Sequence, residues 1–328
     1  MSFANAIYHK YVVLSAGQTH RFVMKFRIWH MLALPAMDRW LKHHDSPACQ
    51  MRLKSAITFL TLFAVGVAAD AAPLPAPYPV DIPSGSSTLH AQLYKPDGDG
   101  PFPVVIALHG CGGLAGHSEP VLPRYRDWAE QLLKAGKAVL LPDSYGSREL
   151  GPQCRAGERR VHARRERVAD IMASRQWLLQ QPWTARDRIS LLGWAHGASA
   201  LLWAVRPQLS SPNVEPDFRS AVAFYPDCRI SSGLGWSARI PTLVLIGAKD
   251  DVSSPPACRQ MVDGARGRSA LARIVVYPGA YHDFDRPNLP PHAIAATSDA
   301  ALPERGHLGT DPEARTDSQK RVAEWLAR

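Results

Sequence analysis

The stretch Ile-Ser-Leu-Leu-Gly-Trp-Ala-His-Gly-Ala-Ser-Ala-Leu-Leu-Trp, residues 189–203, decides how this chain folds. An apolar run typical of a buried strand leads into a tight Gly-x-x-x-Gly turn at Gly193, and an Ala- and Leu-rich segment typical of a helix follows directly. In a strand–turn–helix corner of this kind, the central residue is held exposed in a strained backbone, where it serves as a nucleophile. The central residue here is Ala195, whose methyl group cannot attack a carbonyl.

The segments on both sides of this corner alternate between strand and helix patterns. Alternating apolar and polar residues predict a half-buried strand over 89–94. Further strands are predicted over 104–108, 138–142, 189–193, 221–225, 242–246 and 273–277. Helical periodicity predicts helices over 119–135, 157–180, 199–206, 256–264 and 313–327. This alternation predicts an α/β fold, with a mostly parallel central sheet and helices on both faces. We expect 89–94 to be an edge strand, and 286–312, rich in Pro, Ala and Gly, to be a loop near the site.

Residues 51–72 have the parts of a secretory signal peptide. A short positive segment is followed by about fifteen mostly apolar residues and by small residues, with cleavage expected near Ala71 or Ala72. The apolar run is shorter than the roughly 20 residues that span a bilayer, so we expect no stable membrane insertion after cleavage. We therefore expect a periplasmic or secreted protein.

The remaining boundaries follow from this signal. Because an export signal normally begins a chain, we expect Met51 to be the biological start and residues 1–50 to be a leader without biological role. Four prolines at alternate positions predict an extended linker over residues 73–84. Residues 85–328 are then expected to form one folded domain.

The basic character of the chain belongs mostly to the leader. The formal net charge is +9, and residues 1–54 hold eight Lys and Arg against two Asp. The arginines between 155 and 167 are interleaved with Glu158 and Glu166, and no aromatic residues are spaced among them for base stacking. We therefore interpret them as a solvated helix face and expect no nucleic-acid partner. The oligomeric state stays open.

Four of the five cysteines lie in the expected mature domain, an even number that fits an oxidising compartment. Cys228 and Cys258 follow successive strand regions at the same edge, so we favour a disulfide between them. Cys111 with Cys154 is the weaker second pairing, and four buried thiols are the alternative.

Chemistry-bearing residues follow three of the predicted strands. In open parallel sheets, functional residues collect at the carboxyl ends of strands. His-Gly-Cys-Gly-Gly at 109–113 is a glycine-rich turn whose backbone N–H groups can stabilise a developing oxyanion. The N–H of His196 would supply the second donor of this oxyanion hole. A carboxylate at Asp250 or Asp251 and an imidazole at His282 follow two later strands. Along the chain, the strand–turn–helix corner at Ala195, which has the form of a nucleophile elbow, comes first, and the aspartate and the histidine follow in that order.

Taken together, these motifs resemble the exported branch of the dienelactone hydrolase family, within the α/β-hydrolase superfamily. The similarity covers residues 85–290 and is carried by HGCGG (109–113), PDSYGSR (142–148), GWAHG (193–197), FYPDC (224–228), GAKDD (247–251) and YPGAYHDFD (277–285).

The resemblance implies hydrolysis of a small carboxylic ester or lactone, with no cofactor. It makes Asp250 the acid, His282 the base, and the N–H groups of Cys111 and His196 the oxyanion hole. The family's aspartate usually stands three residues after the glycine, which favours Asp250 over Asp251. The family's nucleophile, Ser or Cys, falls on Ala195.

Two functions are therefore open. The first is an exported ester or lactone hydrolase whose nucleophile position holds Ala195, by natural loss or by an engineered substitution. The alternative is a pseudoenzyme that binds a small acyl ligand without turning it over. Neither Ser199, Ser144 nor Cys111 has the geometry of the elbow, so we do not expect any of them to replace the nucleophile. We expect no metal site, because no two ligand-type side chains stand at ligand spacing on one predicted element.

Overall fold

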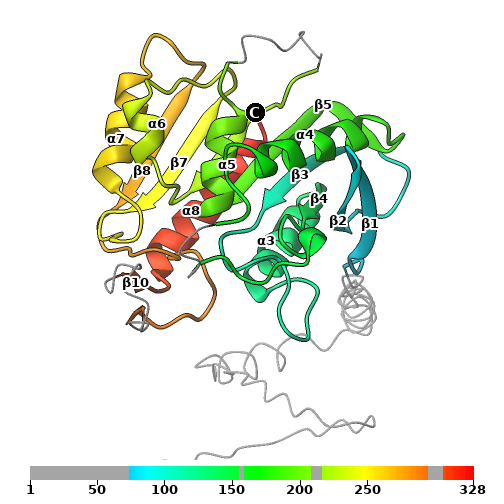
Figure 1. Ribbon diagram of the computed structural model, residues 1–328, viewed down its shortest axis with the longest axis horizontal. Helices are drawn as coiled ribbons and strands as arrows, with labels where there is room; N and C mark the ends of the chain where they lie inside the picture. The colour runs from blue at the N-terminus through cyan, green and yellow to red at the C-terminus, as the bar shows by residue number, and fades with distance from the viewer. Residues whose placement is uncertain (1–73, 155–158, 208–215, 295–305) are drawn as a thin grey trace, which may run out of the picture. The chain divides into compact units, whose positions relative to one another are not determined.

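The computed structural model describes residues 74–328 except 155–158, 208–215 and 295–305 (Figure 1). All of these residues belong to one compact unit, which spans residues 72–328. The expected leader, signal peptide and start residue lie outside the described residues.

An eight-stranded sheet forms the centre of this unit, with strand order β1-β2-β4-β3-β5-β6-β7-β8. Its strands are β1 (Tyr78–Ser84), β2 (Ser87–Tyr94), β3 (Phe102–Leu108), β4 (Ala138–Pro142), β5 (Thr184–Trp194), β6 (Ala221–Phe224), β7 (Thr242–Gly247) and β8 (Ala272–Tyr277). β2 pairs antiparallel with both neighbours, and the strands from β4 to β8 pair in parallel. A separate antiparallel pair joins β9 (His292–Ala293) to β10 (His307–Leu308).

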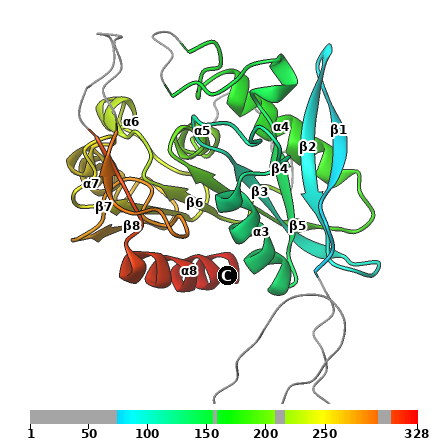
Figure 2. The same ribbon diagram turned by 90° about the horizontal axis from the view of Figure 1, so that it is seen from below.

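Helices cover both faces of the sheet. They are α3 (Pro123–Lys134), η1 (Gly146–Arg148), α4 (Glu166–Leu179), α5 (His196–Ala204), α6 (Arg229–Gly233), α7 (Pro255–Gly264) and α8 (Pro312–Leu326). Figure 2 shows α3 and α8 on one face, and α4 and α5 on the other. The predicted α/β fold with a mostly parallel, doubly covered sheet is therefore confirmed.

The continuous apolar runs of the sequence form the middle of the sheet. Every residue of β4, β6 and β7 is buried, as is the stretch from Val104 to Leu108 in β3. Strands with helices packed on both faces have no solvated side, so they carry no alternating polar residues. This explains why the runs predicted these strands well.

The start of the sheet differs from the sequence-based expectation. β1 lies inside the stretch expected to be a linker, and it pairs with β2 from Tyr78 opposite Leu93 to Ser84 opposite Ser87. The expected edge position of 89–94 is therefore wrong, because β1 takes it. Prolines at 79 and 83 are tolerated there, since an outer strand leaves alternate N–H groups unpaired.

Two predicted helices begin later than expected. α3 begins at Pro123 rather than at residue 119, with proline in its first turn, where the missing N–H costs nothing. α4 begins at Glu166 rather than at residue 157, and the Glu166 carboxylate accepts the backbone N–H of His162 from the turn before the helix. Short α6 was not predicted.

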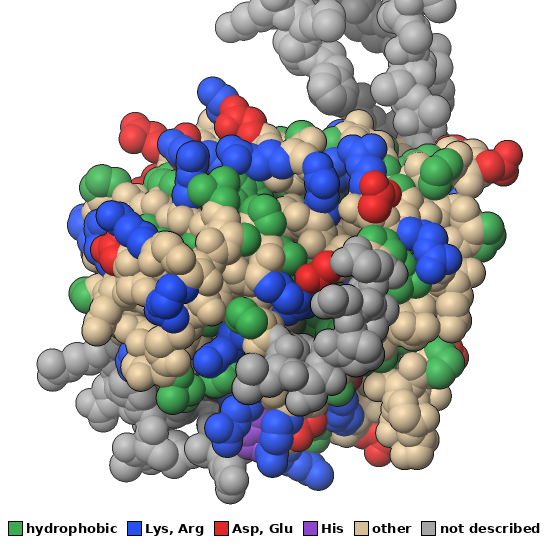
Figure 3. Space-filling view, turned by 90° about the horizontal axis from the view of Figure 1, so that it is seen from above, with side chains coloured by type: hydrophobic (Ala, Val, Ile, Leu, Met, Phe, Trp, Pro, Cys, Tyr) green, Lys and Arg blue, Asp and Glu red, His purple; other side chains and the backbone are tan. Residues whose placement is uncertain are grey.

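Both expected disulfides are present. Cys111 bonds to Cys154, and Cys228 bonds to Cys258. Across the described residues, no helix combines the length and the apolar character that crossing a membrane requires. On the face drawn in Figure 3, Lys and Arg side chains form several groups, with acidic and apolar side chains between them.

Candidate active site

The corner between β5 and α5 keeps the strained backbone of a nucleophile elbow. Ala195 has φ 47° and ψ −111°, a conformation that costs a non-glycine residue about 1 to 3 kcal/mol. Its N–H donates to the carbonyl of Phe224 at 3.0 Å, and its own carbonyl accepts the N–H of Ser199 at 2.8 Å. The surrounding bonds thus hold the corner, although its side chain carries no reactive atom.

The two glycines of the turn are required by close packing. A Cβ at Gly197 would lie 2.2 Å from the carbonyl oxygen of Leu108, and one at Gly193 would lie 2.9 Å from the backbone nitrogen of Ala198. No side chain fits at either position. The sharp turn therefore brings α5 directly against the end of β3.

A histidine and a carboxylate from two other strand ends form a buried pair. Nδ1 of His282 lies 2.9 Å from Oδ2 of Asp250, and the other oxygen of Asp250 accepts the N–H groups of Val252 and Ser253 at 3.0 and 2.8 Å. Burial lowers the pKa of His282, but the charge and hydrogen bond of Asp250 outweigh it, so the pKa lies above its ordinary value of 6.5. The carboxylate is therefore arranged to orient and stabilise a protonated imidazole.

The neighbouring carboxylate has a different partner. Asp251 binds His307, accepting its backbone N–H at 2.7 Å and lying 2.8 Å from its Nδ1. Of the two sequence candidates for the acid, only Asp250 contacts His282 among the described residues. The Asp251 contact fixes β10 next to the histidine loop, where Leu308 pairs with His282.

The glycine-rich loop after β3 lies against the elbow. A Cβ on Gly110 would come within 3.7 Å of the Cβ of Ala195, so the two segments are adjacent. The N–H of Gly110 donates to the hydroxyl of Tyr125 at 2.8 Å and is not available to a ligand. The next N–H along the loop is that of Cys111, whose position is fixed by the disulfide to Cys154 and by a bond from the N–H of Gln153 to its carbonyl at 2.7 Å.

His196, the residue after the elbow, begins α5 with a buried and neutral side chain. Its Nδ1 lies 2.7 Å from the hydroxyl of Tyr145 and 3.4 Å from Nη1 of Arg167. Burial and the neighbouring Arg167 charge lower the pKa of His196 to about 2. Because an arginine only donates hydrogen bonds, we infer that Nδ1 accepts and that the ring proton lies on Nε2.

A buried polar network behind His282 was not anticipated from the sequence. The Asp285 carboxylate accepts hydrogen bonds from Trp128, Trp194 and Tyr225 at 2.7, 2.9 and 2.5 Å. The Tyr225 ring packs against the imidazole of His282, with centroids 4.4 Å apart. The acidic residues of the HDFD stretch were a visible signal, but their partners lie far away in the sequence.

The same loop contains a buried ion pair. Asp283, next to His282, pairs with Arg124 from α3 and has a positive φ of 62°. Burial raises the pKa of Asp283, but Arg124 outweighs this effect and lowers it, so the carboxylate stays charged. The pair holds the histidine loop at Asp283 in a left-handed backbone conformation, which is uncommon for residues other than glycine.

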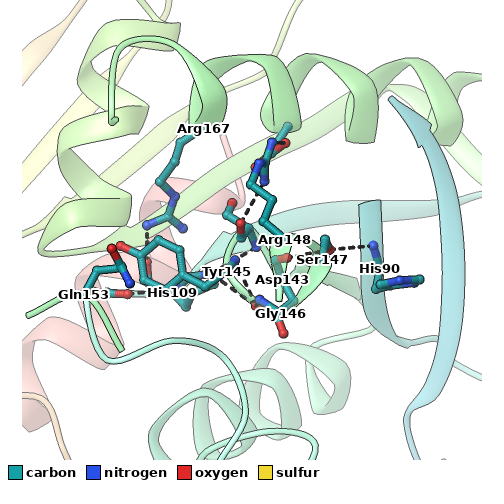
Figure 4. Close-up of polar contacts among 12 residues, drawn as sticks. His90, His109, Asp143, Tyr145, Gly146, Ser147, Arg148, Gln153 and Arg167 are labelled. Carbon is teal, nitrogen blue, oxygen red and sulfur yellow. Dashed lines mark hydrogen bonds and ion pairs between the residues drawn. The ribbon is translucent and has the colours of Figure 1, made fainter. Parts of the chain in front are cut away.

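One sequence interpretation is wrong at Arg167. The sequence predicts a solvated helix face here, but the Arg167 side chain is fully buried and points from α4 toward His109 and Tyr145 (Figure 4). It lies on the same helix turns as Asp170 and Ile171, which are also buried. Because charged residues are interleaved along this segment, the sequence does not show which face of α4 is buried.

The three substitute nucleophiles are unsuited to attack. Cys111 is bound in a disulfide and has no thiol, and Ser144 is fully buried. The Ser199 hydroxyl donates to the carbonyl of Ala195 and accepts the N–H of Asp227, both at 3.0 Å. Within the described residues, no group of three or more His, Cys, Asp or Glu side chains could hold a metal ion.

Comparison with known proteins gives a clear family. Residues 89–328 match the family model described as the dienelactone hydrolase family. This chain belongs to the dienelactone hydrolase family. A Yersinia pestis protein provisionally named carboxymethylenebutenolidase is 25% identical over 244 residues, which are 66% of this chain and 82% of that protein.

Solved structures of dienelactone hydrolases share the fold. A dienelactone hydrolase from Anabaena variabilis has a TM-score of 0.54 at 20% identity, covering 78% of this chain and 98% of its own. A dienelactone hydrolase-like promiscuous phosphotriesterase from metagenomic libraries has a TM-score of 0.59 at 17% identity, with coverage of 78% and 98%. At these identities the likeness establishes the α/β-hydrolase fold of the family and no more.

Proposed function

We propose that this protein has the active site of a dienelactone hydrolase-like ester or lactone hydrolase, with Ala195 at the nucleophile position. Asp250 is the proposed acid and His282 the proposed base, with the N–H groups of Cys111 and His196 as the oxyanion hole. The buried His282–Asp250 hydrogen bond is the observation that carries the proposal. The strained backbone at Ala195 supports it, since such strain persists at functional corners.

Without a nucleophile in the elbow, no acyl-enzyme forms, and water is the attacking group. His282 takes a proton from water as the water oxygen bonds to the carbonyl carbon, and the oxyanion accepts hydrogen bonds from the two N–H groups. The tetrahedral intermediate then expels the alkoxide, which takes the proton back from His282. Catalysis of this kind is slow, because a site missing a triad member keeps only about 10³ to 10⁴-fold acceleration over water.

A second candidate function is favoured by Ala195 itself. A methyl group at the elbow leaves the binding surfaces in place while removing covalent chemistry, which suits a protein that binds a small acyl ligand without turnover. The native chain, tested against a panel of short p-nitrophenyl esters and lactones, discriminates the two. Turnover that His282→Ala abolishes supports the hydrolase, and binding by calorimetry without turnover supports the pseudoenzyme.

We also propose that the protein is exported to the periplasm or secreted, with residues 51–72 as its signal peptide. The two disulfides support this proposal, because disulfides persist in oxidising compartments. N-terminal sequencing of the expressed protein tests it. A mature chain that begins near residue 72 or 73 is expected, and a mature chain that keeps residues before Met51 would contradict it.

A further inference from the structure

Arg167 is a buried cation that contacts both of the segments that carry the proposed oxyanion-hole N–H groups. Its Nη1 donates to the carbonyl of His109 at 2.7 Å, at the start of the loop that carries Cys111. The same Nη1 lies 3.4 Å from Nδ1 of His196, the residue that carries the other N–H. One guanidinium nitrogen thus bridges two segments that come from different strands.

Arg167 makes no ion pair with a carboxylate among the described residues. Asp170, one turn along α4, is held in a two-point ion pair by Arg148 at 2.8 and 3.0 Å. Asp143 accepts the N–H groups of Tyr145 and Gly146 at 3.2 and 2.8 Å. Within the described part of the chain, Nε and Nη2 of Arg167 make no hydrogen bond.

Arg167 also lies against the ring of Tyr145. Its guanidinium carbon lies 5.6 Å from the centre of the Tyr145 ring (Figure 4). The Tyr145 hydroxyl in turn contacts Nδ1 of His196. A buried, unpaired charge costs folding free energy, so a scaffold without a use for it is more stable with an apolar residue there. A buried positive charge beside an oxyanion hole favours the negative charge that develops in the transition state.

We propose that Arg167 is a positioning residue for the hydrolysis proposed above. Its guanidinium holds the His109 loop and the His196 end of α5 in register and adds a fixed positive charge behind the oxyanion. This inference rests on the proposed function. It extends the site by one residue that touches no substrate and acts through the two backbone N–H donors.

The test uses Ala195→Ser as the parent, with p-nitrophenyl acetate as substrate. Arg167→Met in this parent is expected to lower kcat by about tenfold to a hundredfold, somewhat less than the loss of an oxyanion-hole donor, with KM little changed. Arg167→Lys, which keeps the charge, is expected to retain a higher kcat than Arg167→Gln, which keeps only a donor.

Arg239→Met is the matched control. Arg239 is paired with Asp217 and donates to the carbonyl oxygens of Ala204 and Arg206, so its charge is compensated and it lies outside the proposed catalytic groups. This substitution is expected to lower Tm and to leave kcat unchanged. Arg167→Met is expected to lower kcat and to leave Tm unchanged or raise it.

The possible outcomes distinguish the proposed role of Arg167 from the proposed hydrolase function. An active Ala195→Ser parent whose kcat is the same with Met at position 167 overturns the role of Arg167 and leaves the proposed function standing. If Arg167→Met does not fold, equal kcat for the Lys and Gln variants overturns the role instead. A parent that hydrolyses no ester overturns the proposed function and this inference with it.

Discussion

The indole Nε1 of Trp194 donates a hydrogen bond to Oδ2 of Asp285 at 2.9 Å, which ties the residue before the elbow to the loop that carries His282. Trp194 ends β5 and Asp285 lies three residues after His282. Both side chains are fully buried. This buried hydrogen bond therefore helps to fix the position of the elbow relative to the imidazole of His282.

We predict that Asp285→Ala destabilises the fold by about 3 to 5 kcal/mol, because it leaves the donors of Trp128, Trp194 and Tyr225 buried without an acceptor. Urea unfolding measures the change. Asp263→Ala is the control, since Asp263 is an exposed partner of Arg266 and its loss should cost at most about 0.5 kcal/mol. Equal effects of the two substitutions would show that the Asp285 network contributes nothing.

Relief of the backbone strain at Ala195 gives a second prediction. Ala195→Gly should leave the free energy of unfolding unchanged or raise it by about 1 kcal/mol, since glycine adopts a positive φ without the Cβ penalty. The same change at Ala200, inside α5, should cost at least about 1 kcal/mol. Thermal unfolding compares the two. A loss at position 195 as large as that at position 200 would mean that the corner is not strained.

The raised pKa of His282 predicts the pH dependence of an Ala195→Ser variant. His282 must be neutral to act as a base, and Asp250 keeps it protonated to a pH above its ordinary 6.5. The rate should therefore fall on the acid side with an apparent pKa above 6.5. Profiles of kcat/KM against pH between 5 and 9 measure it.

Asp250→Asn should move this acid limb to lower pH, because burial alone lowers the pKa of the imidazole, and it should lower kcat by about 10⁴-fold. Asp251→Asn is the matched control and should change neither value by much, since Asp251 binds His307. A large loss of kcat with Asp251→Asn and little change with Asp250→Asn would instead make Asp251 the acid of the site.

The disulfide between Cys111 and Cys154 closes a span of 43 residues and anchors the proposed oxyanion loop. Its loss in Cys154→Ser should destabilise the fold by about 2 to 4 kcal/mol and, in the Ala195→Ser parent, lower kcat. Cys258→Ser opens the bridge to Cys228, which includes no residue of that loop, and should affect stability more than kcat. Alkylation without reductant that labels one of these four cysteines in the native protein would contradict the bridge to which that cysteine belongs.

The sequence predicted the parts of this fold that one segment determines alone. The run from Val104 to Leu108 is a strand because it is apolar on both sides, and Gly193 and Gly197 mark the elbow because nothing larger fits there. The contact between Asp250 and His282 followed from placing chemistry at parallel strand ends.

The features that the sequence did not predict depend on distant partners. Tyr78–Ser84 reads as a proline-rich linker and becomes a strand only because β2 offers an edge. Arg167 reads as a surface charge and is buried because the loop after β3 and the start of α5 lie beneath it. Asp285 has no local sign of its three donors.

Restoring a serine at position 195 tests the central claim most directly. The elbow, the His282–Asp250 pair and the two N–H groups are proposed to need only a hydroxyl at this corner to form an acyl-enzyme. Ala195→Ser should therefore hydrolyse p-nitrophenyl acetate with a rapid first turnover, at a rate about 10²-fold or more above the native chain, and His282→Ala should remove the gain. A well-folded Ala195→Ser protein with no more activity than the native chain would contradict the account.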